Sequence, residues 1–126
     1  MTITRTKDRI KKTGEVFTPT ALVDEILDKL PPELFTDPTK TFIDPACGDG
    51  NFLVRVLQRK IDNGSTPTQA ISTTYGVELM SDNVEECHSR LLDIVGEEHR
   101  DIVTNNVVCA DSLNGWDYDN WCEKVT

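Results

Sequence analysis

Three carboxylate side chains, those of Asp44, Glu78 and Asp111, each stand at or just beyond the end of a short apolar segment. A carboxylate accepts hydrogen bonds through both oxygens, so it can bind two neighbouring hydroxyls or an exocyclic amine. At the end of a strand, Glu78 would suit the hydroxyls of a ribose, and Asp111 would suit the amine of an adenine. The positions of these acids therefore predict an adenosine-binding edge.

The segment Asp44-Pro45-Ala46-Cys47-Gly48-Asp49-Gly50 predicts a tight turn directly after the first apolar segment. Its two glycines let the backbone bend sharply and approach a ligand without a Cβ in the way. The turn lacks the Gly-x-Gly-x-x-Gly pattern of dinucleotide sites, and Asp44 and Asp49 would repel phosphates. These acids suit a cationic ammonium or sulfonium group. An adenosine joined to a cationic amino acid is S-adenosylmethionine.

A parallel sheet would bring these groups to one edge. Strands are expected over residues 41–44, 74–78 and 106–109, and helices with one apolar face over 52–61 and 81–95. Strand, helix, strand, helix, strand is the order of a parallel α/β sheet with flanking helices. Ligands of such sheets bind outside the carboxyl ends of the strands, where the three acids stand.

Two further helices are expected from capping and proline signals. Thr18 is predicted as the N-cap of a helix with Pro19 at its first position, continuing to Leu30. A proline pair ends that helix, and residues 31–40 are predicted as a loop. A brief helix is expected over 66–71, while Ser81 is predicted as the cap of the helix that Gly96 ends.

Length and charge limit the possible functions. The 126 residues are enough for one domain, and the formal net charge of −9 argues against a stand-alone nucleic-acid binder, because phosphate contacts need a basic face. Residues 1–13 are nevertheless basic and predict a flexible arm, followed by a domain over 14–126. The basic residues of this arm are Arg5, Lys7, Arg9, Lys11 and Lys12.

Cysteine usage and hydropathy indicate a reduced, cytoplasmic protein. The four cysteines form no Cys-x-x-Cys pair and only two histidines are present, so we expect neither a metal site nor a disulfide framework. Cys47 and Cys109 are expected to be small buried residues. No apolar run approaches the ~18 residues of a membrane span, and we expect no membrane association.

The motifs together resemble the N6-adenine branch of the DNA amino-methyltransferases. Residues 14–19, Gly-Glu-Val-Phe-Thr-Pro, are similar to the segment that closes over the methionine part of the cofactor. Residues 44–53 resemble the cofactor turn, with Asp49 where a serine is more usual. Residues 75–79 and 110–113 resemble the ribose-binding and adenine-binding segments. The resemblance assigns cofactor binding to Phe17, Thr18, Pro19, Asp44, Pro45, Ala46, Cys47, Gly48, Gly50, Asn51, Phe52, Glu78, Leu79, Asp111, Ser112 and Leu113.

This resemblance implies a partial Rossmann-like fold of the S-adenosylmethionine-dependent methyltransferases, with the catalytic half missing. The family's catalytic motif, Asn/Asp-Pro-Pro-Tyr/Phe, does not occur in the sequence, and the pair Pro31-Pro32 has neither flanking group. That motif holds the flipped base against the methyl donor. We therefore expect a truncated, cofactor-binding portion of an adenine-specific restriction-modification methyltransferase. Alone it would be inactive, meeting DNA only within a larger assembly or full-length enzyme.

Other functions and partners stay open at this stage. A non-catalytic S-adenosylmethionine-binding regulator or decoy is the main alternative, and a methyltransferase for RNA or protein glutamine is less favoured by residues 14–19. The family's sheet order would leave the first strand as an edge, because the fourth strand normally lies beside it. We expect a homodimer, a completing partner chain, or residues 116–121 folded back to cover that edge.

Overall fold

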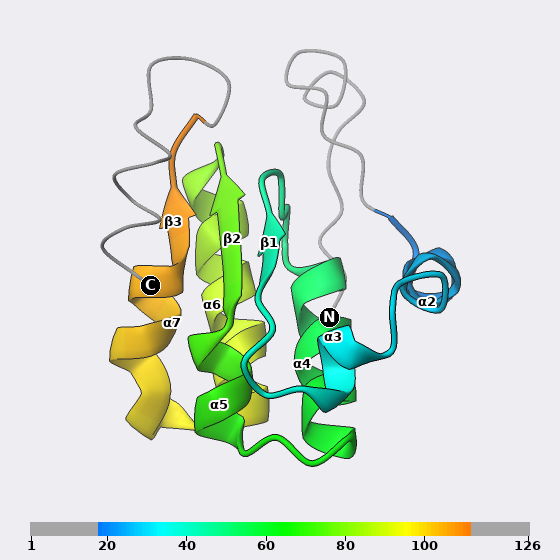
Figure 1. The fold of residues 1–126 in the computed structure, drawn as a ribbon. Helices are drawn as coiled ribbons and strands as arrows, with labels where there is room; N and C mark the ends of the chain where they lie inside the picture. The colour runs from blue at the N-terminus through cyan, green and yellow to red at the C-terminus, as the bar shows by residue number, and fades with distance from the viewer. Residues whose placement is uncertain (1–17, 112–126) are drawn as a thin grey trace.

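A three-stranded parallel sheet organises the chain, with the strands in the order β1 (Phe42–Asp44), β2 (Thr74–Glu78) and β3 (Val107–Cys109). The computed structural model describes residues 18–111. Asp44 pairs with Gly76 across the first two strands, and Glu78 pairs with Cys109 across the last two. The carboxyl ends of all three strands therefore meet at one edge, at the top of Figure 1.

Helices make both connections between the strands. One crossover contains α4 and α5, and the next contains α6, a 3-10 helix and α7, while α2 and α3 precede the sheet (Figure 1). Their bounds are α2 Thr20–Leu27, α3 Glu33–Thr36, α4 Asn51–Asp62, α5 Pro67–Ser72, α6 Ser81–Val95, η1 Glu97–His99 and α7 Arg100–Asn106. Within residues 18–111, no helix has the length and apolar character needed to cross a membrane.

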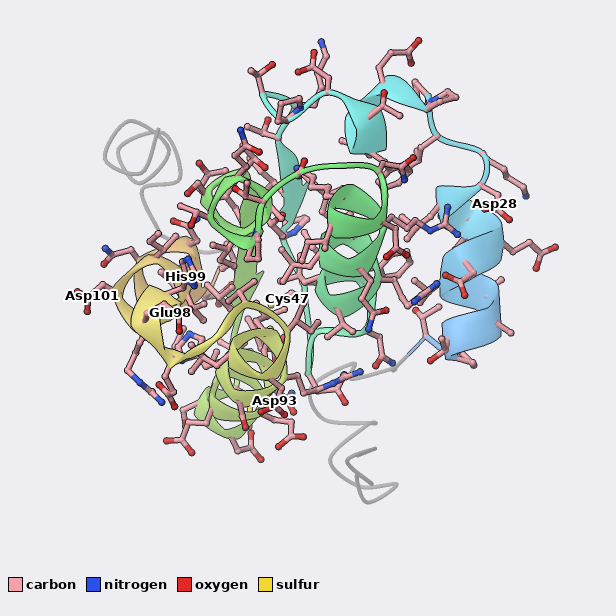
Figure 2. All side chains as sticks on the ribbon, turned by 90° about the horizontal axis from the view of Figure 1, so that it is seen from below. Asp28, Cys47, Asp93, Glu98, His99 and Asp101 are labelled. Atoms are coloured by element: carbon pink, nitrogen blue, oxygen red, sulfur yellow. The ribbon has the colours of Figure 1, made fainter. Side chains whose placement is uncertain are left out.

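The main core lies between the sheet and helices α4 and α6. Leu53 and Leu57 of α4 and Leu91 of α6 are fully buried there, because helical spacing places them on the face turned to the sheet. Cys47 joins this core from the turn after β1, and Figure 2 shows it between the two helices. Tyr75 belongs to a separate cluster on the strands.

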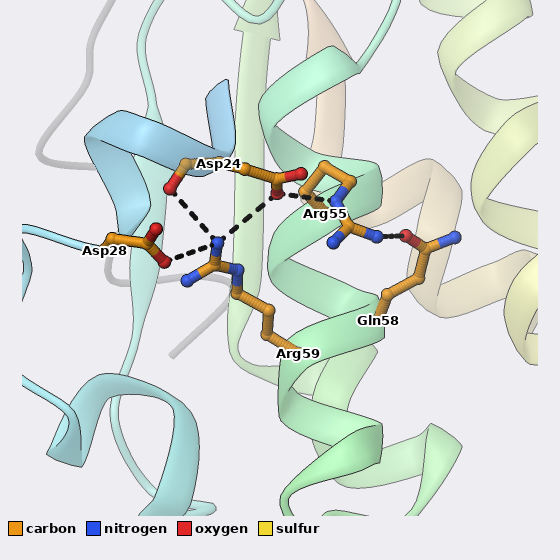
Figure 3. A network of polar contacts seen from close by, with 5 residues as sticks. All are labelled: Asp24, Asp28, Arg55, Gln58 and Arg59. Atoms are coloured by element: carbon orange, nitrogen blue, oxygen red, sulfur yellow. Dashed lines mark hydrogen bonds and ion pairs between the residues drawn. The ribbon is translucent and has the colours of Figure 1, made fainter. Parts of the chain in front are cut away.

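A second, smaller core attaches α2 and α3 to the outer side of α4. Val23 and Leu27 are buried there with Phe35 and Val56. A polar network borders this contact: Arg55 Nε lies 2.7 Å from Asp24 Oδ1, and Figure 3 shows Arg59 reaching both Asp24 and Asp28. Apolar burial and ion pairs therefore fix α2 alongside α4.

The predicted fold class is confirmed: the chain is α/β, with a small parallel sheet and flanking helices. All three strands form within one residue of the predicted segments, and β1 is an edge of the described sheet, as expected.

The brief helix predicted over residues 66–71 is also present, as α5. Thr66 Oγ1 accepts from the backbone N–H of Gln69 at 3.1 Å, and the Gln69 side chain accepts from Thr66 N at 2.9 Å.

The predicted course of the first helix is wrong at both ends. α2 begins at Thr20 with Pro19 as its N-cap and no side-chain cap bond, and it ends at Leu27 rather than Leu30. The proline pair starts a new helix, because Pro32 occupies the N-cap position of α3 in the predicted loop. Burial of Phe35 explains why this turn forms.

Two smaller expectations also need correction, and one helix was not expected. Met80, not Ser81, is the N-cap of α6, and Ser81 is its first helical residue. Cys109 is exposed rather than buried, because it lies at the open carboxyl end of β3. The helix α7 had no counterpart among the predicted elements. It is anchored by the buried Asn106, whose Nδ2 donates a 2.8 Å hydrogen bond to Ile71 O.

Candidate functional site

The turn after β1 is held against β2 by backbone hydrogen bonds. Cys47 N donates to Val77 O at 2.9 Å, and Gly50 N donates to Cys47 O at 3.0 Å. Gly48 and Gly50 both have positive φ, and a Cβ on Gly50 would lie 2.8 Å from Cys87 Sγ. The glycines predicted for this turn are therefore required by backbone conformation and by space.

A glycine that was not assigned to the site, Gly76, allows the turn to approach the sheet. A Cβ on this residue of β2 would lie 2.7 Å from Leu53 Cδ1 and 2.9 Å from Cys47 Sγ. Real Cβ atoms do not tolerate such distances, so a side chain at residue 76 would force the side chains of Leu53 and Cys47 to shift. Gly76 therefore helps to set the position of the candidate site.

A cavity of about 100 Å³ lies beside this turn, and most of the residues lining it were predicted site residues. Asn51 closes one side, because its Nδ2 donates a 2.7 Å hydrogen bond to Thr18 O. Pockets that hold a whole drug-sized ligand are about 300–1,000 Å³, so this cavity can accept only one end of such a ligand. Its lining consists of Thr18, Asp44, Ala46, Cys47, Gly48, Asp49, Asn51 and Phe52.

Asp44 supplies a carboxylate to this cavity. Its Oδ1 accepts a 3.1 Å hydrogen bond from Ala46 N. Burial raises the pKa of the Asp44 carboxyl above its usual value of 3.8; the bond from Ala46 opposes this shift, and the negative charge of Glu78 adds to it. A cationic ligand group would stabilise the charged form of the Asp44 carboxyl, so the electrostatics of the site suit a cation.

The Glu78 carboxylate is held in a fixed orientation at the end of β2. Glu78 is only 8% exposed, and its Oε2 accepts from Asn83 Nδ2 at 2.8 Å and from Met80 N at 3.2 Å. Among the described residues, both of these donors bind the same oxygen, Oε2. A glutamate at the end of a strand is ordinarily solvated. The burial of Glu78 and its two donors distinguish it from such a residue.

The adenine side of the predicted site is described only in part. Ala110 N donates to Glu78 O at 3.0 Å, which extends the pairing of β2 and β3 to Ala110, the residue before Asp111. Leu79 is 51% exposed and presents apolar surface directly after Glu78. The other predicted site residues, Phe17, Ser112 and Leu113, lie outside the described residues, as do the basic arm and residues 116–121.

Asp49 lines the cavity, but its carboxylate is also paired with a basic side chain. Its residue is only 1% exposed, and its Oδ1 lies 3.3 Å from Arg90 Nη1. The charge that was expected to attract a cationic ligand is thus balanced by a guanidinium from α6. Of the two acids in the turn, Asp44 is the one whose charge supports a cation site.

Sequence reasoning missed two polar residues that shape the site, Arg90 and Asn83. Arg90 is the single basic residue of α6, a helix otherwise rich in acids, and this contrast was an available signal. Asn83 is fully buried near the start of α6, but nothing in the local sequence marks it as a partner of Glu78.

The buried thiol of Cys47 is structural. Its hydrogen bond with Cys87 and its burial raise the pKa of the Cys47 thiol, and the carboxylates of Asp44 and Glu78 act in the same direction. A nucleophilic cysteine needs a lowered pKa. Cys47 therefore contributes packing to the turn rather than reactivity.

Comparison with known proteins agrees with this arrangement. A family model described as N-6 DNA Methylase matches residues 3–117, which include the whole described sheet and the turn after β1. A search of curated proteins gave no match. Since the match spans most of the 126 residues, the chain belongs to the N-6 DNA methylase family, and its function is of the DNA-methyltransferase type.

Proposed function

We propose that the edge formed by β1, β2 and β3 is the S-adenosylmethionine site of an N6-adenine DNA methyltransferase. The observation that carries the proposal is the cavity beside Asp44, which adjoins the strand end where the Glu78 carboxylate is held by two donors. The family to which the chain belongs generally uses this cofactor.

The order of the strands along this edge of the sheet sets the orientation that we propose for the bound cofactor. The cavity at the end of β1 would receive the amino acid and the sulfonium, with Asp44 as the acceptor for positive charge. Glu78 at the end of β2 would accept from the ribose, and Asp111 beyond β3 from the adenine amine. Leu79 would contribute apolar contact. The bound cofactor would supply an electrophilic methyl group.

The proposed task of these 126 residues is cofactor binding without methyl transfer by this polypeptide alone. The exocyclic amine of a flipped adenine needs acceptors and a stacking aromatic beside the methyl donor. The resemblance assigns these groups to Asn/Asp-Pro-Pro-Tyr/Phe, which the sequence does not contain. The same observation favours a second candidate, a regulatory or decoy protein that binds the cofactor.

We further propose that another segment, chain or copy completes the sheet beside β1. This strand is an edge of the described sheet, and its Phe42 and Ile43 are both half-buried. An unpaired strand edge is a template for further strand pairing. DNA would then be bound by the completed assembly, because the chain itself carries a net charge of −9.

The proposal is tested by calorimetric titration with S-adenosylmethionine, S-adenosylhomocysteine and ATP. Binding of the first two and no saturable binding of ATP is expected, because the carboxylates repel phosphates. Equal binding of all three would contradict the assignment of Asp44 to a cation site. A parallel assay of labelled methyl transfer to unmethylated DNA should remain at background. Incorporation above background would show that this polypeptide forms an acceptor site, and would contradict both inactivity alone and the decoy alternative.

A further inference from the structure

Arg90 reaches the cofactor turn from α6, across a large separation in the sequence. Its Nη1 donates to Asn51 Oδ1 at 2.8 Å and to Asp49 O at 3.1 Å, and it lies 3.3 Å from Asp49 Oδ1. The Arg90 side chain is 21% exposed, whereas that of Asp49 is 2% exposed. One guanidinium nitrogen thus contacts both residues that flank Gly50.

These contacts continue through the Asn51 side chain to the opposite wall of the cavity. An amide group has one accepting end and one donating end. Arg90 binds the oxygen of Asn51, so the nitrogen is directed toward Thr18 O, to which it donates at 2.7 Å. Without Arg90, the terminal torsion of Asn51 would have broad freedom. The contacts from Arg90 through Asn51 therefore fix the position of Thr18, which lies just before α2.

The charge of Arg90 is matched to an unusual residue of the turn. A buried carboxylate is costly unless it is paired, and Arg90 supplies the opposite charge to Asp49. A serine, which is more usual at this place in the similar family, would be neutral and would not need a guanidinium. Asp49, which lines the cavity, and Arg90, which does not, thus form a charge pair at its wall.

We propose that Arg90 is a positioning residue for the amino-acid end of the cofactor, acting through Asn51 on Thr18. The inference rests on the proposed function, and it assigns this role to a residue that makes no part of the cavity lining. Arg90 would close the cavity at the end of β1 and leave the strand ends at Glu78 and Asp111 unaffected. Replacing Arg90 should therefore weaken the binding of ligands that contain the amino-acid part and leave the binding of ligands without it unchanged.

The distinguishing measurement compares S-adenosylmethionine with 5′-methylthioadenosine, which lacks the amino-acid part. Arg90→Ala should weaken binding of S-adenosylmethionine about tenfold, the worth of one hydrogen bond. Binding of 5′-methylthioadenosine should change by no more than about twofold, the usual limit for independent sites. Arg90→Lys, which keeps the charge but loses the planar fork, should fall between the wild type and Arg90→Ala.

Asn51→Ala keeps the Asp49–Arg90 pair and removes the contacts of the Asn51 amide to Arg90 and Thr18, so it tests the proposal even if Arg90→Ala does not fold. Both variants should show the same selective loss, and the double variant should lose no more than Arg90→Ala alone. The matched control is Arg100→Ala, which removes an exposed arginine paired with Glu97 on the surface. This control should bind both ligands like the wild type.

The outcomes separate this inference from the proposed function. If the wild-type chain binds neither ligand, the proposed function is wrong and the inference falls with it. If the wild type binds both ligands and the Asn51→Ala variant loses affinity for both equally, the cofactor site stands but the positioning role is wrong. Loss confined to S-adenosylmethionine supports the role of Arg90.

Discussion

Asn83 Nδ2 donates a 2.8 Å hydrogen bond to Glu78 Oε2, and this bond joins the end of β2 to the start of α6. Asn83 is 0% exposed and Glu78 is 8% exposed, so water cannot replace the amide freely. A buried carboxylate with a fixed donor has one orientation, and its other oxygen is the proposed acceptor for a ligand hydroxyl.

The Asn83→Ala variant should bind S-adenosylmethionine about tenfold more weakly, because a buried charged acceptor loses its donor. Unlike the Arg90 variants, it should weaken 5′-methylthioadenosine to the same extent, since Glu78 is the proposed acceptor for the ribose that both ligands contain. Calorimetric titration with the two ligands measures this. Unchanged affinity for both would mean that the orientation of Glu78 is not set by Asn83.

Asp44→Asn should make the free protein more stable at neutral pH while weakening S-adenosylmethionine binding. The folded-state pKa of Asp44 is raised by burial, so the fold favours the protonated carboxyl. The stability that this protonated form contributes is present below the unfolded pKa of 3.8 and is lost as pH rises through the folded pKa. The Asp44→Asn variant has no titrating carboxyl and so avoids this loss of stability at neutral pH. It also lacks the negative charge that would attract a sulfonium.

The Asp44 prediction is checked by thermal unfolding and ligand titration across the acidic range. The difference in stability between wild type and Asp44→Asn should shrink as pH falls toward 3.8, and wild-type affinity should fall over the same range because Asp44 becomes neutral. Wild-type affinity that stays constant while Asp44 protonates would contradict its role in binding the cation.

Lys60 gives a prediction about stability at alkaline pH. Its Nζ donates to Lys40 O at 2.7 Å and to Thr73 Oγ1 at 2.6 Å, and burial lowers the pKa of Lys60 to about 8. The unfolded chain, with a lysine pKa of 10.5, binds more protons between these two values. The contribution of Lys60 to the free energy of unfolding should therefore rise with pH in this window.

The measurement for Lys60 is chemical unfolding of the wild type and of Lys60→Met at pH 7.5 and pH 9.5, values on either side of about 8. Other groups, such as the Cys47 thiol, titrate equally in both proteins and cancel in the difference. The stability of the wild type relative to Lys60→Met should be greater at the higher pH. A constant difference would show that Lys60 titrates at its ordinary pKa in the folded chain.

Attachment of α2 should depend more on apolar burial than on the ion pairs in Figure 3. Leu27 is 1% exposed, and Leu27→Ala should lower the free energy of unfolding by about 2–5 kcal/mol. Asp24→Ala should have a smaller effect, because Asp24 and Arg55 are each about one-third exposed and water screens their attraction. Denaturant unfolding compares the two, and a larger loss in Asp24→Ala would reverse this ranking.

Much of the sheet and turn could be predicted because their signals are local. The apolar segments that become β1, β2 and β3 are short and are followed by turn residues or acids, and the glycine turn follows β1 directly. α7 could not be predicted in this way, because the helix has few apolar residues and depends on a distant bond from Asn106 to Ile71. Tertiary contacts, rather than local sequence, therefore determine that α7 forms.

The same limit applies within the site. The type of residue at Asp49 suggested a charge facing the ligand, but a partner 41 residues away balances it. The two cysteines likewise differ in environment, since Cys47 packs against Gly76 while Cys109 lies at the open end of β3. The residue type shows which interactions such a side chain can make, whereas the fold determines whether it is buried, paired or exposed.

The most direct test of the cofactor site is calorimetric titration of S-adenosylmethionine into the wild type, Glu78→Gln and Glu78→Ala. Glutamine keeps an oxygen for Asn83 but loses the charge, so Glu78→Gln should fold normally and bind more weakly. Glu78→Ala should lose on the order of 1.5–3 kcal/mol of binding free energy. Glu97→Ala, which removes an exposed acid of η1, should bind like the wild type. Wild-type affinity in both Glu78 variants would contradict the assignment of the ribose to this edge of the sheet.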